Sequence, residues 1–338
     1  MTNSINVGLI GAGRIGQVHA ETLSYRIPQA NLIAVADVFV ESAKKCADRF
    51  QIPTVTADPQ DIFNNPAIDA VVICSSTNTH APLMTQAANA GKHIFCEKPI
   101  ALNLAQIDSA LAAVERAGVK LQIGFNRRFD PNFKAARDMV AAGKIGQPHL
   151  VRISSRDPEP PPIEYIKVSG GLFLDMTIHD FDMARYLIDS EVEEIFTSGA
   201  VLVDPAIGQA GDVDTAVITL KYANGAIGTI DNSRKAVFGY DQRVEVFGSG
   251  GNVVVSNTTP HTAVLSNEQG VHAPPPPFFF LERYLEAYAA EMEAFISAVQ
   301  NDTPPPVTGI DGRIPVVMGM AAWKSYRENR PVKLSEIE

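Results

Sequence analysis

Residues 5–125 alternate short apolar segments with helical patterns, and this alternation constrains the fold more than any other feature of the chain. The apolar segments are rich in Val, Ile, Ala and Phe, as expected of strands that are covered on both faces. Such strands, separated by helices, predict βαβ units and a doubly wound parallel sheet. The expected strands are residues 5–10, 32–36, 70–74, 93–96 and 121–125, and the expected helices are 16–25, 40–50, 82–90 and 104–117.

The pattern changes after residue 126, where strands joined by turn signals replace the alternation with helices. Asn224-Gly225 and the glycine-rich residues 248–251 each separate two strand-like segments, as in β-hairpins. These hairpins predict a mostly antiparallel sheet. Its expected strands are residues 149–155, 216–222, 226–232, 243–247 and 252–256, and the expected helices are 132–142, 175–187, 282–299 and 312–326.

Length and pattern together predict two domains. With 338 residues, of which 46% are hydrophobic, the chain is long enough for more than one core. We expect an α/β Rossmann domain over residues 1–126 and an α+β domain with a large, mostly antiparallel open sheet over residues 127–338. In this arrangement the final helix can pack back on the first domain.

The segment Gly11-Ala12-Gly13-Arg14-Ile15-Gly16 follows the first apolar strand and opens the first helix. A G-x-G-x-x-G pattern is a weak signal alone, but in this context it predicts a dinucleotide-binding turn. Gly11 permits the tight turn, Gly13 lets the backbone approach a pyrophosphate, and Gly16 lets the helix pack on the sheet. The helix N-terminus then offers unpaired N–H groups to the phosphates.

An acidic residue stands at the end of the second predicted strand, where the ribose of a dinucleotide would bind. Asp37 follows Gly16 by 21 residues, the spacing expected of the carboxylate that holds the adenosine ribose hydroxyls. No Lys or Arg follows Asp37 before Lys44, and a 2′-phosphate placed against Asp37 would be repelled. The sequence therefore predicts NAD rather than NADP as the cofactor.

Polar residues also follow two later strands, at the edge of a parallel sheet where ligands bind. Ser75, Asn78 and His80 could contact the ribose and nicotinamide, although a helix-capping loop explains any one of them equally well. In Glu97-Lys98-Pro99, Glu97 is a further cofactor candidate, and the lysine could stabilise developing negative charge on an alcohol oxygen. A solvated lysine is the alternative, but Pro99 fixes the turn at this edge.

Residues 170–182 contain an acid and a histidine at helical spacing. Asp175 and His179 lie four residues apart, so on a helix they share one face. A carboxylate there can hold an imidazole in one tautomer while its other nitrogen faces a substrate. A structural pair has the same spacing. Together with the dinucleotide turn and Glu97-Lys98-Pro99, however, the pair predicts a dehydrogenase.

Charge, hydropathy and cysteine spacing argue against a nucleic-acid-binding protein, a membrane protein and a secreted protein. The net charge of −10 argues against nucleic-acid binding, since an acidic surface repels phosphate backbones. No apolar run approaches the about 18 residues of a membrane span, and no signal-peptide pattern opens the chain, so we expect a cytoplasmic protein. Cys46, Cys74 and Cys96 are widely spaced, as in a reducing compartment, and no metal-ligand spacing is present.

The motifs together resemble the glucose–fructose oxidoreductase/inositol dehydrogenase superfamily over nearly the whole chain. They are the dinucleotide turn, Glu97-Lys98-Pro99 and the Gly-Gly-x-x-x-Asp-x-x-x-His pattern that ends at His179. Within the superfamily, residues 124–130, 155–162 and 170–187 are most similar to the inositol 2-dehydrogenases. The resemblance implies an NAD-binding domain and a substrate domain that commonly assembles into dimers or tetramers.

The resemblance also implies roles for individual residues. Lys98 resembles the catalytic lysine of the superfamily, His179 its general acid/base, and Asp175 the carboxylate that pairs with this base. The candidates for binding substrate hydroxyls are Asp157, Asp182, one or both of Arg127 and Arg128, Tyr240 and Tyr284. For the two tyrosines, packing in the core is an equally good explanation.

We therefore expect NAD-dependent oxidation of myo-inositol to its 2-keto form (scyllo-inosose), with His179 as the general base. The alternatives are oxidation of scyllo-inositol, another inositol isomer or an aldose; an NAD-dependent glycosidase and a non-catalytic NAD(H)-binding regulator are more distant. Residues 213–220 leave both faces of their strand fairly apolar, which predicts a homo-oligomer, a tetramer or dimer, assembled through the C-terminal sheet.

Overall fold

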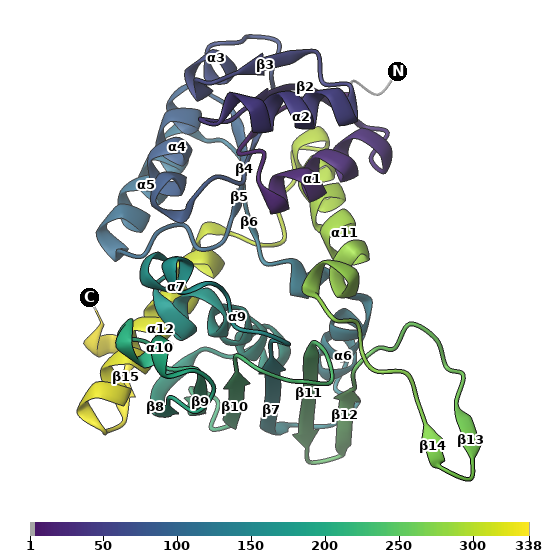
Figure 1. Cartoon of the computed structure of the whole chain (residues 1–338). Helices are drawn as coiled ribbons and strands as arrows, with labels where there is room; N and C mark the ends of the chain where they lie inside the picture. Colours follow the sequence, from purple (N-terminus) through teal and green to yellow (C-terminus); the bar gives the residue numbers. More distant parts are fainter. Residues whose placement is uncertain (1–3, 338) are drawn as a thin grey trace. The chain divides into compact units, whose positions relative to one another are not determined.

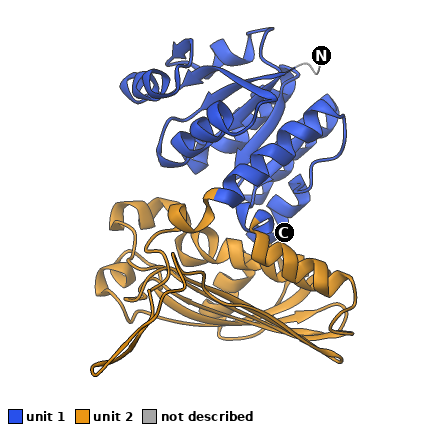
Figure 2. Cartoon of the chain, turned by 90° about the vertical axis from the view of Figure 1, so that its right-hand side faces the viewer, with its two compact units in different colours: residues 1–129, 286–316 blue, residues 130–285, 317–338 orange. Residues whose placement is uncertain are grey.

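The computed structural model describes residues 4–337, which divide into two compact units (Figure 1, Figure 2). Unit 1 runs through Phe129 and is completed by Glu286–Val316. Unit 2 consists of Asp130–Leu285 and the segment from Val317 onward. The helices α11 (Phe280–Gln300) and α12 (Gly309–Glu328) therefore each contribute residues to both units.

Unit 1 is built on a six-stranded parallel sheet in the order β3-β2-β1-β4-β5-β6. This strand order is that of a Rossmann fold and confirms the predicted α/β class. The strands are β1 (Ile5–Ile10), β2 (Ala30–Ala36), β3 (Thr54–Thr56), β4 (Ala70–Ile73), β5 (His93–Glu97) and β6 (Leu121–Gly124). The helices are α1 (Arg14–Tyr25), α2 (Val40–Phe50), α3 (Pro59–Phe63), α4 (Thr77–Asn89), α5 (Leu104–Ala117) and the short 3-10 helix η1 (Asn126–Phe129).

The core of unit 1 includes residues that are distant in the sequence. All four residues of β4 are fully buried, as expected of a strand with helices on both faces. The core formed by β1, β2, α1 and α2 also contains Met292, Phe295 and Ile296 of α11, which lies beside α1 in Figure 1. Burying one such side chain stabilises the fold by about 1.5–3 kcal/mol. Helix α11 is therefore an integral part of the Rossmann unit.

Unit 2 is built on a seven-stranded sheet in the order β12-β11-β7-β10-β9-β8-β15. Strands β7 and β10 are parallel and the other neighbours are antiparallel, which confirms the mostly antiparallel sheet. The strands are β7 (Pro148–Arg156), β8 (Val192–Ala200), β9 (Thr215–Tyr222), β10 (Ile227–Ser233), β11 (Asp241–Gly248), β12 (Gly251–Val255) and β15 (Val332–Lys333), with a separate hairpin of β13 (Leu265–Asn267) and β14 (Gly270–His272). The other helices are α6 (Pro131–Ala141), α7 (Ile163–Ser169), α8 (Gly171–Asp175), α9 (Thr177–Ile188), α10 (Pro205–Gln209) and the 3-10 helix η2 (Leu334–Glu336).

The two faces of the large sheet have different surroundings. In β9, Ile218 and Leu220 point into the core of unit 2, whereas Val217 on the opposite face is 51% exposed. Helices α6 and α9 pack on strands of this sheet, and in the described part of the chain the helices of unit 2 lie on one face of it only (Figure 1).

None of the helices within residues 4–337 combines the length and apolar character that a membrane span requires.

Two helices differ more from the prediction than the others do. The helix expected over 82–90 begins at Thr77, so Pro82 lies inside α4. Residues 171–188 form two helices with Met176 between them, and the His179 N–H donates to the Met176 carbonyl at 3.3 Å.

The Thr177 side chain lies beside the break. The Thr177 hydroxyl donates to the Leu172 carbonyl at 3.2 Å, the same oxygen that accepts from the Met176 N–H. Asp175 therefore ends α8 while His179 stands in the first turn of α9. The prediction that one continuous helix carries both residues is wrong.

Candidate active site

The glycine turn of unit 1 has the shape that a dinucleotide needs. Gly11 has a φ of +97°, and a Cβ there would stand 2.6 Å from the backbone of Cys74 and Ser75. A Cβ on Gly16 would stand 2.0 Å from the Gly11 carbonyl oxygen, so glycine is required at both positions. Among residues 4–337, nothing lies within 4 Å of a Cβ placed on Gly13, and no side chain caps the start of α1. The open backbone and the uncapped N–H groups fit a pyrophosphate.

Asp37 stands at the end of β2 and is bound to the glycine turn. Its Oδ2 accepts a hydrogen bond from the Ala12 N–H at 2.7 Å, and its Oδ1 accepts one from the Phe39 N–H at 2.8 Å. A carboxylate has about four lone-pair sites, so capacity remains for ribose hydroxyls. Lys44, the first basic residue after Asp37, forms an ion pair with Glu41 at 2.8 Å. The arrangement therefore fits the ribose diol of NAD.

His80 joins the loops that follow β4 and β5. Its Nδ1 lies 2.8 Å from the Pro99 carbonyl oxygen and its Nε2 lies 2.9 Å from that of Ser75. Burial lowers the pKa of His80, although the two carbonyls act in the opposite direction. The hydroxyls of Ser75 and Thr79 lie 2.6 Å apart, while Asn78 is exposed in the first turn of α4. Both ring nitrogens of His80 thus face backbone carbonyls, and the one N–H of the neutral ring can donate to either of them.

Glu97 and Lys98 stand at the carboxyl end of β5. Glu97 is the last residue of this strand, and its Oε1 lies 2.8 Å from the His19 Nε2. Lys98 is partly buried and is joined to Pro99 by a cis peptide bond. Because β1, β2, β4 and β5 are neighbours in the sheet, their carboxyl ends bring the glycine turn, Asp37 and Lys98 to one edge.

The carboxylate of Asp175 in unit 2 is held by two residues that the sequence analysis missed. The Tyr165 hydroxyl donates to its Oδ1 at 2.9 Å, and Arg234 Nη1 donates to its Oδ2 at 3.0 Å. Arg234 is only 2% exposed and also lies 3.6 Å from Asp157. Burial lowers the pKa of Arg234, but Asp175, Asp157 and Asp212 raise it by more, so the guanidinium stays charged. Two predicted acids, Asp157 and Asp175, thus share one buried cation.

Glycine in the motif before Asp175 has a structural reason. Gly171 has a φ of +76°, and a Cβ there would stand 2.7 Å from Asp212 Oδ1. That oxygen accepts a hydrogen bond from the Leu172 N–H at 3.0 Å, at the start of α8. Glycine therefore lets α8 start against Asp212, and this contact sets the position of Asp175 at the other end of the short helix.

His179 is partly buried in the first turn of α9, and a network below it fixes this turn. The side chain of Asn232 in β10 accepts a hydrogen bond from the Thr177 hydroxyl at 2.6 Å and donates one to Asp180 at 2.8 Å. Asp182 is fully buried in the same helix. The backbone that carries His179 is therefore tied to the large sheet of unit 2.

The remaining predicted residues are largely buried. Arg127 is 4% exposed in η1, and Arg128 forms an ion pair with Asp311 at 2.9 Å. The rings of Tyr240 and Tyr284 meet edge to face with centroids 5.9 Å apart, an arrangement typical of aromatic packing. The roles of these residues toward a substrate stay predictions.

Comparisons with known proteins agree with one another. Residues 5–125 match an oxidoreductase family with an NAD-binding Rossmann fold, and residues 133–254 match the GFO/IDH/MocA C-terminal domain. The chain is 51% identical over 333 residues to the myo-inositol 2-dehydrogenase of Thermotoga maritima, which covers 98% of this chain and 99% of that protein. It is 45% identical over 332 residues to the inositol 2-dehydrogenase of Rhizobium meliloti, with coverage of 98% and 100%.

Solved structures give the same result. The crystal structure of a probable dehydrogenase from Thermotoga maritima matches with a TM-score of 0.97 at 51% identity, over 99% of this chain and 100% of that chain. The scyllo-inositol dehydrogenase of Lactobacillus casei, crystallised with NAD(H) and scyllo-inositol, matches with a TM-score of 0.93 at 29% identity, over 98% and 100% of the two chains.

Proposed function

This chain belongs to the GFO/IDH/MocA family of NAD-binding oxidoreductases, and we propose that it oxidises myo-inositol at carbon 2 to the 2-keto form, scyllo-inosose. It is an NAD-dependent polyol dehydrogenase. The observation that carries the choice of substrate is the 51% identity, over 98% of the chain, to a myo-inositol 2-dehydrogenase. The acids of unit 2 support this choice, because carboxylates accept hydrogen bonds from the hydroxyl groups of a polyol.

Unit 1 fits the cofactor of this family. The open backbone at Gly13 and the start of α1 would hold the pyrophosphate, and Asp37 would hold the adenosine ribose. When bound, NAD⁺ accepts a hydride from the carbon of an alcohol. Since His80 and Glu97 contact neighbouring protein groups, we propose that they shape the loops beside the cofactor. The other proposed cofactor contacts are Gly11, Arg14, Ile15, Gly16, Ser75 and Asn78.

His179 is the proposed general base. Its imidazole would take the proton of the reacting hydroxyl as the hydrogen on the same carbon leaves with its electron pair, a type of catalysis that contributes about 10²–10⁴-fold. Asp175 would favour the protonated imidazole by its negative charge. Tyr165 and Arg234 already hold this carboxylate, so its position is set before a substrate binds.

Lys98 is the proposed partner of the alcohol oxygen. Its ammonium group would donate a hydrogen bond to this oxygen and stabilise the negative charge that develops as the proton leaves. The acids and the arginine would bind the other hydroxyls and so select one isomer. These proposed substrate contacts are Asp157, Asp182, one or both of Arg127 and Arg128, Tyr240 and Tyr284.

A substrate panel tests the proposal. We would follow NADH formation at 340 nm with NAD⁺ and, in turn, myo-inositol, scyllo-inositol, chiro-inositol, glucose and xylose, using the wild-type protein, Lys98→Ala and His179→Ala. We expect turnover with myo-inositol that both variants abolish. Preference for scyllo-inositol, the ligand of the Lactobacillus casei structure, would replace the substrate and keep the mechanism. If the wild-type protein forms no NADH with any substrate of the panel, the proposal is refuted.

Self-association through the large sheet of unit 2 is proposed as well. Val217, Ile227, Phe247 and Val254 are each about half exposed, at 51%, 53%, 47% and 55%, which is unusual for a set of large apolar side chains in one sheet. A second copy of the chain would bury them. Light scattering after size exclusion should show a dimer or tetramer that Val217→Lys dissociates, whereas a wild-type monomer would contradict this part of the proposal.

A further inference from the structure

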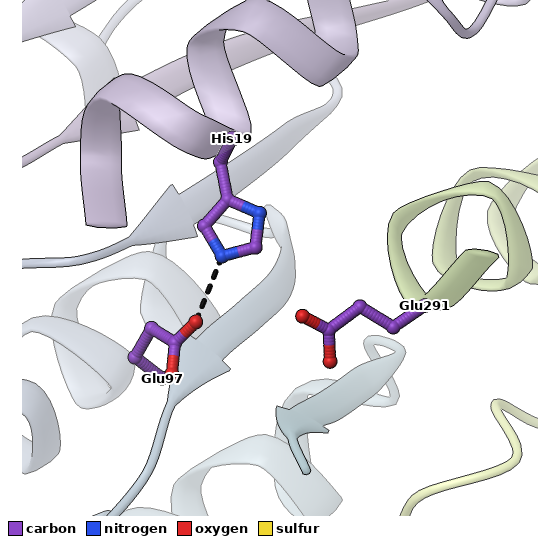
Figure 3. A group of neighbouring side chains, drawn as sticks. All are labelled: His19, Glu97 and Glu291. Carbon is purple, nitrogen blue, oxygen red and sulfur yellow. Dashed lines mark hydrogen bonds and ion pairs between the residues drawn. The ribbon is translucent and has the colours of Figure 1, made fainter. Parts of the chain in front are cut away.

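Three side chains of unit 1 form a buried polar cluster (Figure 3). His19 comes from α1, Glu97 from the end of β5 and Glu291 from α11, and one nitrogen or oxygen atom of each lies within 4.8 Å of the other two. His19 and Glu291 are fully buried. The rings of Phe95 and Tyr288 pack against His19 with centroids 5.0 and 5.8 Å away, so the surroundings of the cluster are largely apolar.

Glu97 is fixed within this cluster from two sides. Its Oε1 lies 2.8 Å from His19 Nε2, as described above. On the other side, a Cβ on Gly124 of the neighbouring β6 would stand 3.0 Å from the Glu97 carboxylate, so glycine leaves the space that the carboxylate occupies. Because Lys98 follows Glu97 directly, contacts that hold the Glu97 side chain also restrain the backbone next to Lys98.

Glu291 is the member without a partner. Within residues 4–337, neither of its buried carboxylate oxygens has a hydrogen-bond partner, and Figure 3 shows one of them pointing toward His19 and Glu97. An ionised carboxylate in this place would be desolvated beside a second negative charge, which is costly. Burial, and then the charge of Glu97, raise the pKa of Glu291 well above its ordinary value. The neutral acid is therefore the favoured form.

We propose that Glu291 is a positioning residue: as a buried neutral acid it donates a hydrogen bond into the Glu97–His19 pair and so holds the turn that carries Lys98. The proposal rests on the role of Lys98 proposed above. A carboxylic acid has one O–H to donate. A small rotation of the Glu291 side chain, or one bridging water, would connect this O–H to the Glu97–His19 pair. Gln122 of β6 keeps α11 in place, because its Nε2 donates to the Glu291 backbone carbonyl at 2.7 Å.

A divalent cation is the alternative occupant of the cluster, since one imidazole and two carboxylates are a ligand set that zinc accepts. The hydrogen bond between His19 and Glu97 favours a protonated Glu291 over a bound cation. Ligands of a cation would direct these two atoms at the cation rather than at each other. The two alternatives differ in their response to Glu291→Gln. Glutamine keeps the size and neutrality of the acid and its ability to donate, but it removes the ionised ligand that a cation needs.

The test compares Glu291→Gln and Glu291→Ala with Glu293→Gln, a control at an exposed position of the same helix. We would measure kcat with myo-inositol, the Kd of NAD⁺, and hydrogen–deuterium exchange of residues 94–101 without substrate. Glu291→Ala should lower kcat about tenfold to a hundredfold, raise the exchange of this segment and change the Kd little. Glu291→Gln should restore most of the lost kcat and the low exchange, and Glu293→Gln should match the wild type.

Three results would overturn the proposal. The first is that Glu291→Gln lowers kcat and raises exchange as much as Glu291→Ala does. The second is that Glu291→Ala has the same exchange and the same kcat as the wild type. The third is a stoichiometric divalent cation, found by elemental analysis of the wild-type protein and lost in Glu291→Gln. Should the alanine variant fail to fold, Glu291→Leu, with a similar volume and no polar atom, takes its place. Because exchange is measured without substrate, the outcome stands even if the protein proves not to oxidise a polyol.

Discussion

Replacing Arg234 by methionine should destabilise unit 2 by about 3 kcal/mol. The Arg234 side chain is 2% exposed, and its Nη1 lies 3.0 Å from Asp175 and 3.6 Å from Asp157. Methionine keeps much of the volume but leaves both carboxylates without their shared cation. Removing one partner of a buried ion pair costs about 3–5 kcal/mol. We expect the lower end, because the two carboxylate side chains keep 13% and 24% of their exposure and can recruit water.

Thermal unfolding measures this effect directly. For a domain of this size, 1 kcal/mol shifts Tm by about 2–4 °C, so Arg234→Met should lower it by roughly 6–12 °C. Lys235→Met, at the exposed neighbouring position, is the matched control and should change stability by less than about 0.5 kcal/mol. Adding Asp175→Asn to Arg234→Met should recover part of the loss, since one of the two carboxylates that lost the guanidinium becomes neutral. An Arg234→Met protein that melts with the Lys235→Met control would refute the reasoning.

Further substitutions test the cofactor turn and the buried cluster. Gly13→Ala should preserve Tm but weaken NAD⁺ binding in calorimetry, whereas Gly16→Ala should lower both, because its Cβ would meet a backbone oxygen at 2.0 Å; equal effects of the two would contradict this account. Asp37→Ser should raise the ratio of kcat/KM for NADP⁺ to that for NAD⁺ at least about tenfold, and an unchanged ratio would speak against its ribose contact. The raised pKa of Glu291 gives a stability contribution that is fully present below its unfolded value of 4.5 and is lost as pH rises toward the folded value. In denaturant titrations across this window, the wild type should therefore lose up to about 1.4 kcal/mol per pH unit relative to Glu291→Gln, and parallel pH profiles would contradict a neutral Glu291.

Much of unit 1 could be predicted because its strands and helices have strong local patterns. The predicted bounds of β1, α2 and α5 coincide with those of the structure. A parallel strand that is buried on both faces needs an almost continuous apolar run, and an amphipathic helix needs apolar residues at a spacing of three to four. The glycine turn was equally readable, since Gly11 and Gly16 are required by backbone contacts within one βα unit.

Contacts between residues that are distant in the sequence leave no local pattern of this kind in the sequence. Met292, Phe295 and Ile296 look like the apolar face of any helix, and only the tertiary structure shows that they complete the core of unit 1. Arg234 reads in sequence as a polar residue after a strand. Its partner Asp175 lies 59 residues earlier, and the pairing depends on how α8 packs in unit 2.

The break at Met176 shows a different limit. A spacing of four residues predicts a shared helical face for Asp175 and His179 if the helix is continuous. The Thr177 hydroxyl lies 2.6 Å from Oδ1 of Asn232, a residue of β10, and 3.2 Å from the Leu172 carbonyl oxygen, so the surroundings of the break include a strand that is distant in the sequence. The sequence predicted a helix at both residues, but the break between them was not predictable.

The most direct test of the proposed reaction uses myo-inositol that carries deuterium at carbon 2. If His179 and Lys98 direct oxidation to this carbon, each turnover should transfer one deuterium to the cofactor, detected by mass spectrometry of the reduced nicotinamide, and the labelled substrate should react more slowly. Reduced cofactor without deuterium would show that the hydride leaves from another carbon and would contradict the assignment of scyllo-inosose as the product.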